Sequence, residues 1–144
     1  AQETIRLNRL TNVCLHPVGV GAKEGVLHLQ VSRGETSLAA GARVVDSPSP
    51  DTIDIEVTTL DKLVPEDRMV SILHLDVENH EGPALEGAHA LLKRCRPIVM
   101  LEADKPWKQR NFAKQLNTIV PEAGYAIAGV LDHNCIFVPL SGGV

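Results

Sequence analysis

The chain lacks the features on which membrane proteins and disulfide-bonded proteins depend. No apolar run approaches the roughly 20 residues that a membrane helix needs. The three cysteines, Cys14, Cys95 and Cys135, show no C-x-x-C spacing and are odd in number. Buried or isolated thiols of this kind are typical of a reducing compartment. We therefore expect a cytoplasmic protein without disulfides.

Aromatic residues and positive charge are also scarce. Aromatic residues make up 3% of the chain, and 14 basic against 18 acidic residues give a net charge of −4. Trp107, Phe112 and Tyr125 form no spaced platform on which bases could stack. A negative chain also has no general attraction for phosphate backbones or anionic lipids. Neither nucleic acid nor a membrane surface is an expected partner.

The chain contains the pattern of an α/β domain. Its 144 residues, 44% of them hydrophobic, suffice for one domain with its own core. Residues 70–75 and 97–102 are nearly unbroken apolar runs, which is typical of parallel strands buried on both faces. Helical patterns follow at 84–92 and at 106–120. Alternating strands and helices predict a parallel sheet with right-handed crossovers.

Two further strands predict that the sheet is mixed. Residues 125–130 and 135–138 flank a turn and should pair as a C-terminal antiparallel hairpin. Residues 13–18 form a short apolar run that we assign to the same sheet. Before it, an amphipathic helix should end at Asn12, because Asn tolerates the left-handed conformation of a helix end.

The section from about 26 to 57 has a different character. Residues 26–31 and 52–57 alternate between apolar and polar, which predicts an inserted antiparallel pair with one buried face. The connection between them is rich in Gly, Ser, Pro and Ala. A connection of about 20 residues is either a lid or disordered, and we expect disorder. Residues 59–63 should form one helical turn that ends before Pro65.

The candidate functional residues cluster where the central strand ends. Asp76, Glu78, His80 and Glu81 lie within six residues, between the buried run and the next helix. Open α/β sheets bind their ligands at such strand ends. The competing interpretation is that the carboxylates only favour the start of the helix.

Three segments together resemble a known family. They are TLDKL at 59–63, LHLDVENHEGPALEGAHALLKRCRPIVMLE at 73–102 and NRLTNVCLHPVGVGAKEG at 8–25. In this order they resemble the FkbM family of S-adenosylmethionine-dependent methyltransferases. The resemblance implies a single class I methyltransferase-like, Rossmann-like domain over residues 1–144 that ends in the reversed hairpin. It also implies methyl transfer to a small-molecule hydroxyl acceptor, most often a sugar or natural product.

The charged strand end supplies the candidate residues. We expect catalytic roles for Asp76, Glu78 and His80, and substrate contacts from Glu81 and from Glu102 at the end of the neighbouring strand. The resemblance implies contacts to the cofactor from the turn Gly19-Val20-Gly21. Asn79 stands where the family has Gly, and Ala22 where an acidic residue is usual.

One expected part is missing from this sequence. The family's first strand, its glycine-rich loop and the acidic end of its second strand should lie upstream of Ala1. We therefore interpret the chain as an N-terminally truncated, partial domain that contains an incomplete binding site for S-adenosylmethionine. An open sheet edge at that place would favour self-association.

Several roles remain open for the charged cluster. Methyl transfer to a hydroxyl needs a base, which a carboxylate or His80 could provide. On a straight strand Asp76 and Glu78 would share one face. Asp76, Glu78 and His80 could instead bind a divalent metal, although we expect no metal, or form a structural network. The alternative to an O-methyltransferase is a non-catalytic interaction module or a metal-binding domain.

Overall fold

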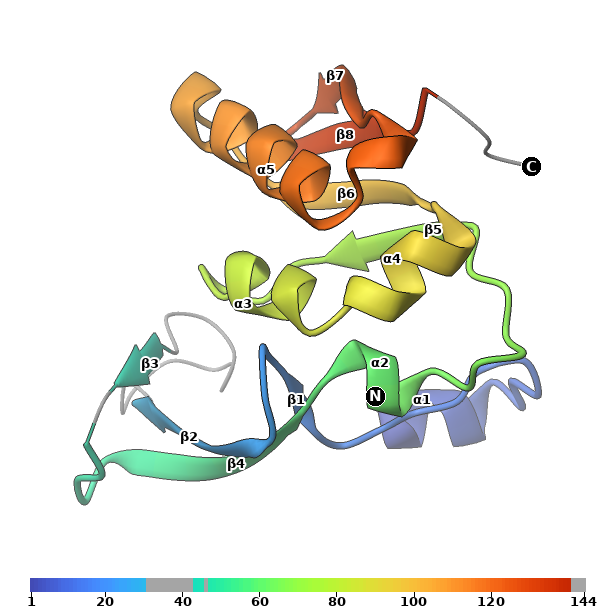
Figure 1. Cartoon of the computed structure of the whole chain (residues 1–144). Helices are drawn as coiled ribbons and strands as arrows, with labels where there is room; N and C mark the ends of the chain where they lie inside the picture. Colours follow the sequence, from blue (N-terminus) through green and yellow to red (C-terminus); the bar gives the residue numbers. More distant parts are fainter. Residues whose placement is uncertain (31–42, 46, 141–144) are drawn as a thin grey trace.

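The computed structural model describes residues 1–30, 43–45 and 47–140 and shows an α/β fold (Figure 1). Two four-stranded mixed sheets lie next to each other, with strand orders β1-β4-β2-β3 and β5-β6-β8-β7. The first sheet comprises β1 (Gly19–Val20), β2 (Gly25–Gln30), β3 (Arg43–Val45) and β4 (Thr52–Thr58). The second comprises β5 (Ile72–Leu75), β6 (Ile98–Glu102), β7 (Ala126–Leu131) and β8 (Asn134–Val138).

Five α-helices are present among the described residues. They are α1 (Gln2–Leu7), α2 (Leu60–Leu63), α3 (Glu81–Glu86), α4 (His89–Cys95) and α5 (Pro106–Ile119), and a short 3-10 turn, η1 (Pro121–Ala123), follows α5. The predicted helical turn at 59–63 is confirmed as α2, which Thr59 caps by accepting the Lys62 N–H.

The inserted antiparallel pair is confirmed. Strands β2 and β4 run antiparallel, with Leu27 opposite Ile55. The connection between them differs from the prediction, because residues 43–45 form a third strand, β3, paired with β2. Its valines, Val44 and Val45, favour a strand because they are β-branched. Residues 32–42 and 46 of the stretch that we expect to be disordered lie outside the described part, as does residue 31 of the predicted strand 26–31.

The prediction that residues 13–18 form a strand of the main sheet is wrong. That segment is irregular, and only Gly19–Val20 pair, in parallel with β4 of the first sheet. Pro17 has no N–H to contribute to a ladder, which shortens the strand. The first helix also ends earlier than predicted. The Asn8 side chain donates to the Thr4 carbonyl at 2.8 Å and closes α1, four residues before Asn12.

The second sheet carries the hydrophobic core. Strand β5 is parallel to β6, and β8 pairs antiparallel with both β6 and β7, so the predicted C-terminal hairpin is confirmed. Helices α3, α4 and α5 cover one face of this sheet (Figure 1). The buried core beneath them includes Leu73, Leu75, Leu85, Leu92, Val99, Leu101, Leu116 and Phe137.

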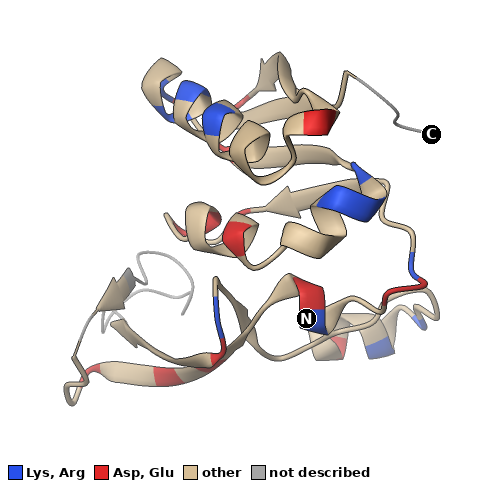
Figure 2. Cartoon of the chain, viewed as in Figure 1, with Lys and Arg blue, Asp and Glu red and all other residues tan. Residues whose placement is uncertain are grey.

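The opposite face of the second sheet is more open. Ile72 is 59% exposed and Ile98 is 39% exposed, and β5 is an edge strand in the part of the chain that the structure describes. The predicted self-association through such an edge stays a prediction. Figure 2 shows basic residues on α5 and acidic residues along β4. No helix among the described residues is both long and apolar enough to cross a membrane.

The single tyrosine gives a pH-dependent test of this fold. Tyr125 is 3% exposed and donates its hydroxyl to the Pro97 carbonyl at 2.8 Å. Burial raises the pKa of Tyr125 to about 12, above the value of about 10 for an exposed tyrosine. Because the folded-state pKa is the higher one, this stabilisation is complete below about pH 10 and is lost as the pH rises through about 12.

We expect the ultraviolet absorbance of tyrosinate to appear together with unfolding, between about pH 10 and pH 12. Tyr125→Phe should lower the free energy of unfolding at neutral pH by about 1 kcal/mol, because it removes the hydrogen bond. In the same variant, the free energy of unfolding should depend less strongly on pH above about pH 10. Ionisation near pH 10 in a protein that stays folded would contradict the burial of Tyr125.

Candidate functional site

The two sheets meet where two glycines pack against each other. A Cβ atom at Gly87 would lie 2.0 Å from the carbonyl oxygen of Gly21, a distance that no side chain tolerates. Gly87 follows α3, so this contact sets the end of that helix against the end of β1. The single helix that the sequence predicts after the central strand is divided at this place into α3 and α4.

Asp61 reinforces the same junction. Its backbone N–H donates to the Gly87 carbonyl at 2.9 Å. Its carboxylate accepts the N–H groups of Ala90 at 2.9 Å and Leu91 at 2.8 Å. Helix α4 has no side-chain cap from its own preceding residue, Ala88, so Asp61 provides the cap from a distance. The aspartate of the TLDKL segment therefore has a structural role.

His80 lies at this junction, directly before α3. The Cβ of an alanine at position 21 would be 3.3 Å from the His80 Nε2 atom and 3.0 Å from Val57. Glycine at 21 therefore allows the imidazole ring to lie against the backbone at the end of β1. The half-buried ring has no hydrogen-bonding partner among the described residues, so both nitrogens remain available.

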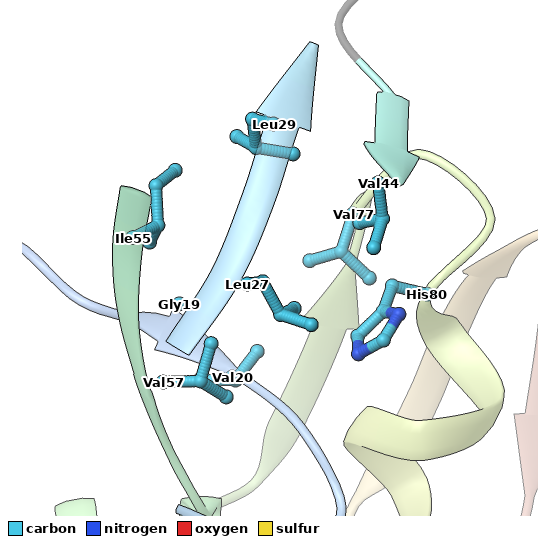
Figure 3. Close-up of a pocket in the computed structure, with 9 residues that line it drawn as sticks. All are labelled: Gly19, Val20, Leu27, Leu29, Val44, Ile55, Val57, Val77 and His80. Atoms are coloured by element: carbon cyan, nitrogen blue, oxygen red, sulfur yellow. The ribbon is translucent and has the colours of Figure 1, made fainter. Parts of the chain in front are cut away.

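Two cavities meet at His80. The first has a volume of about 120 Å³, and Figure 3 shows the side chains that line it. They come from all four strands of the first sheet and from the loop after β5: Gly19, Val20, Leu27, Leu29, Val44, Ile55, Val57, Val77 and His80. The second cavity, of about 250 Å³, continues past Gly21 to Glu24 and Pro83. Leu27, Val57 and His80 border both.

The predicted carboxylates lie in different surroundings. Asp76 is exposed just beyond β5, and by strand alternation it follows His74 onto the face of the sheet away from the helices. Glu102 ends β6 on that same face. Val77, the next residue after Asp76, points into the first cavity instead (Figure 3). The structure therefore brings His80 together with Gly19, Val20 and Gly21, and leaves Asp76 and Glu102 elsewhere.

The expectation that Asp76 and Glu78 share one face of a straight strand is wrong. Strand β5 ends at Leu75, and Glu78 (φ 50°) and Asn79 (φ 68°) both adopt the left-handed conformation, which turns the chain. Asparagine tolerates that conformation better than most residues, so it can replace the family's glycine at 79. The Asn79 side chain also accepts a hydrogen bond from Lys108 of α5 at 3.4 Å.

Glu81 has a structural contact in this structure. It is 3% exposed, and its carboxylate accepts the backbone N–H of Val77 at 3.2 Å. This bond closes the loop between β5 and α3 and so helps to position His80. The predicted role of Glu81 in substrate binding stays a prediction.

The charged side chains do not form a metal centre in the part of the chain that the structure describes. No group of three or more His, Cys, Asp or Glu side chains is placed there to hold a metal ion. Asp76, Glu78 and His80 are accordingly not arranged as three ligands. This geometry gives no support to the metal-binding alternative.

Comparison with known proteins identifies the family. The model of the methyltransferase FkbM domain matches residues 3–127. The chain belongs to the FkbM methyltransferase family. The resemblance predicted from the sequence and the α/β fold class are thus confirmed. A search of the curated proteins finds no match.

One solved structure has a similar fold. The chain is similar to the crystal structure of methyltransferase FkbM from Methylobacillus flagellatus KT, with a TM-score of 0.64 and 17% sequence identity. The match covers 95% of this chain and 32% of that chain. This FkbM chain therefore spans about a third of the length of that protein, and the likeness concerns the fold.

The apolar lining of the cavities was not among the predicted site residues. Its signal was nevertheless present in the alternation of β2 and β4, which places Leu27 and Leu29 on the same face as Ile55 and Val57. That alternation predicts a buried face, but it does not distinguish a face that packs into a core from one that lines a cavity.

The contact between the glycines yields a prediction about stability. Gly87 has φ −78°, which any residue adopts, so Gly87→Ala acts through the clash with Gly21 and a tight contact of 3.3 Å with the Thr59 side chain. We expect the free energy of unfolding to fall by about 3 kcal/mol, the upper part of the usual range for overpacking. Denaturant unfolding measures this change.

The matched control is Gly25→Ala. No heavy atom lies within 4 Å of the added Cβ at that position, so stability should change by no more than about 0.5 kcal/mol. If both variants are equally stable, the two sheets do not meet through Gly21 and Gly87.

Proposed function

We propose that this FkbM chain contributes the acceptor-binding part of an S-adenosylmethionine-dependent O-methyltransferase. Its acceptor would be the hydroxyl group of a sugar or another natural product. The observation that supports this proposal best is the position of His80, whose unpaired ring borders two cavities beside the Gly19–Gly21 turn. Family membership supplies the class of reaction.

The first cavity suits one part of the cofactor. Gly19 and Val20 offer apolar surface for a flat ring such as adenine, and none of the nine lining residues carries a fixed charge. The described part of its lining therefore offers no ionic partner for the carboxylate and ammonium groups at the other end of S-adenosylmethionine. We assign Gly19, Val20 and Gly21 to the adenine end of the cofactor.

His80 is the proposed base. When bound, S-adenosylmethionine supplies an electrophilic methyl group on a positively charged sulfur. The acceptor oxygen must lose its proton as it gains that methyl group, and a positioned base promotes this step. The neutral His80 ring would take the proton on Nε2, the nitrogen that faces Gly21. Glu81, through its bond to the Val77 N–H, would keep the loop that carries the base in place.

The exposed carboxylates would act on the other side of the strand end. Asp76 has no hydrogen-bonding partner among the residues that the structure describes. We propose that Asp76 and Glu78 orient the acceptor or balance positive charge, with Glu102 contributing at the neighbouring strand. These roles have less structural support than that of His80, because none of the three carboxylates lines either cavity.

The methyl transfer rate of the natural protein tests this assignment. His80→Gln should lower the rate of transfer of a labelled methyl group by about 100-fold or more, since general bases contribute about 10²–10⁴-fold. Asp76→Asn should lower it less. The control is His133→Gln, at an exposed histidine in the turn between β7 and β8. Full activity of His80→Gln would remove this residue from the mechanism, and absence of any methyl transfer would favour a non-catalytic interaction module.

Cofactor binding by the 144-residue chain gives a separate prediction. We expect calorimetry to show a dissociation constant for S-adenosylmethionine in the millimolar range or weaker. Hydrogen bonds to charged groups contribute about 1.5–3 kcal/mol each, and the described residues that line the first cavity provide none for the amino-acid end. A micromolar dissociation constant would show that other residues of this chain hold the cofactor.

A further inference from the structure

We propose that the outer face of α5 is a docking surface for an acidic helix of another protein. This basic face consists of Trp107, Arg110 and Lys114, with Lys105 and Lys108 beside it. The inference is independent of the methyltransferase proposal, because α5 covers the second sheet and none of its residues lines either of the two cavities described above (Figure 1).

Positive charge is concentrated on this helix. Residues 105–114 contain four of the 14 basic residues of the chain and no acidic residue, although the chain as a whole carries a net charge of −4 (Figure 2). The preceding carboxylate, Asp104, lies 3.1 Å from Lys105 and 3.8 Å from Lys108. The other two basic residues have no ion-pair partner in the part of the chain that the structure describes. Helix α5 therefore presents positive charge that the described fold does not neutralise.

The stability of α5 does not explain these charges. The N-terminal end of a helix carries a partial positive charge, so Lys105 and Lys108 lie where cations are unfavourable. Arg110 and Lys114 are four residues apart, and like charges at that spacing destabilise a helix. The helix is held instead by its inner face, where Leu116 is fully buried in the core. The outer charges thus have a better explanation in recognition than in folding.

Trp107 adds an apolar anchor to the basic face. It is the only tryptophan of the chain, and it is 56% exposed. Arg110 and Lys114 follow it at intervals of three and four residues, so the three side chains form one stripe about 10 Å long. Tryptophan and arginine are enriched in protein interfaces and often dominate the binding energy there. The composition of this stripe is therefore that of an interface.

The spacing of the stripe favours a helical protein partner. Arg110 and Lys114 lie about 6 Å apart along the helix axis, as do glutamates four residues apart on a partner helix. A membrane surface is disfavoured, because a helix that lies on a bilayer inserts its apolar face, and that face of α5 is packed on the sheet. A nucleic acid is disfavoured, because bases stack on successive aromatic rings and Trp107 is the only aromatic residue on this face.

A second copy of this chain is a poorer partner than a different protein. The acidic residues on β4 include Asp54, which is already bonded to His28 at 2.6 Å. A contact between α5 of one copy and β4 of the next would also join two different surfaces, and such contacts build open chains unless they close into a ring. We therefore assign the basic face to a partner of different sequence.

The single tryptophan allows a direct test by fluorescence. The probe is a helical peptide with glutamates four residues apart on one face, of about 15 residues, the length at which isolated helices become populated. The control peptide carries glutamine at the same positions. At low ionic strength, we expect the glutamate peptide to shift the Trp107 emission to shorter wavelength in a saturable manner, and the glutamine peptide to leave it unchanged.

Variants separate the contributions of charge and of the aromatic ring. Arg110→Gln and Lys114→Gln should each weaken binding of the glutamate peptide by about 3-fold, as expected for exposed ion pairs. The matched control is Lys93→Gln, which removes an exposed charge from α4 and should bind as the unchanged chain does. Trp107→Ala, followed through the anisotropy of a dye-labelled peptide, should weaken binding by about 10-fold. Thermal unfolding establishes that each variant is folded.

Several results would overturn the proposal. They are equal affinity for the glutamine peptide, an equal loss of binding in Lys93→Gln, and unchanged Trp107 emission at the highest peptide concentration. Tighter binding to phosphatidylglycerol vesicles or to a single-stranded oligonucleotide than to the glutamate peptide would assign the face to a membrane or a nucleic acid. If Lys114→Gln lowers the molecular mass of the chain in sedimentation, the partner is a second copy.

Discussion

The backbone contact between Gly21 and Gly87 is the constraint on which the site depends. It brings the end of β1 against the end of α3 with no side chain between them. The carbonyl of Gly87 also accepts the N–H of Asp61, whose carboxylate holds the first turn of α4. One position without a Cβ thereby joins the two sheets. His80, at the start of α3, is held in the space that remains beside this contact.

The sequence predicted the elements whose formation is decided locally. Long apolar runs gave β5 and β6, and period-two alternation gave β2 and β4 with their antiparallel pairing. The helix after β5 was predicted without its break at Gly87, a residue that contacts Gly21, far away in the chain. The strand assigned to 13–18 failed for a related reason. Apolar content marked the segment, but only Gly19–Val20, just after it, form a strand, and their partner, β4, belongs to the inserted region.

The cluster after β5 marked a loop that borders a cavity, since His80 comes from it, but the apolar residues that line the cavity were not predicted. Its geometry depends on two consecutive left-handed residues, Glu78 and Asn79, which direct neighbouring side chains to different sides. Of the charged residues there, Glu81 bonds within the loop and Asp76 remains exposed. Charge in a sequence indicates where polar groups gather, and the local φ angles decide which of them face a ligand.

Under the proposed function, the two sheets have different roles in the site. The first sheet supplies an apolar wall, with Leu27 and Val57 bordering both cavities, and the loop of the second sheet supplies His80. Changes in the wall should therefore alter which molecules bind, and changes at His80 should alter what happens to them. A side chain at position 21 would meet both parts, because its Cβ would lie 3.0 Å from Val57 of the wall and 3.3 Å from the His80 ring. Glycine at 21 thus allows the apolar wall and the proposed base to lie side by side.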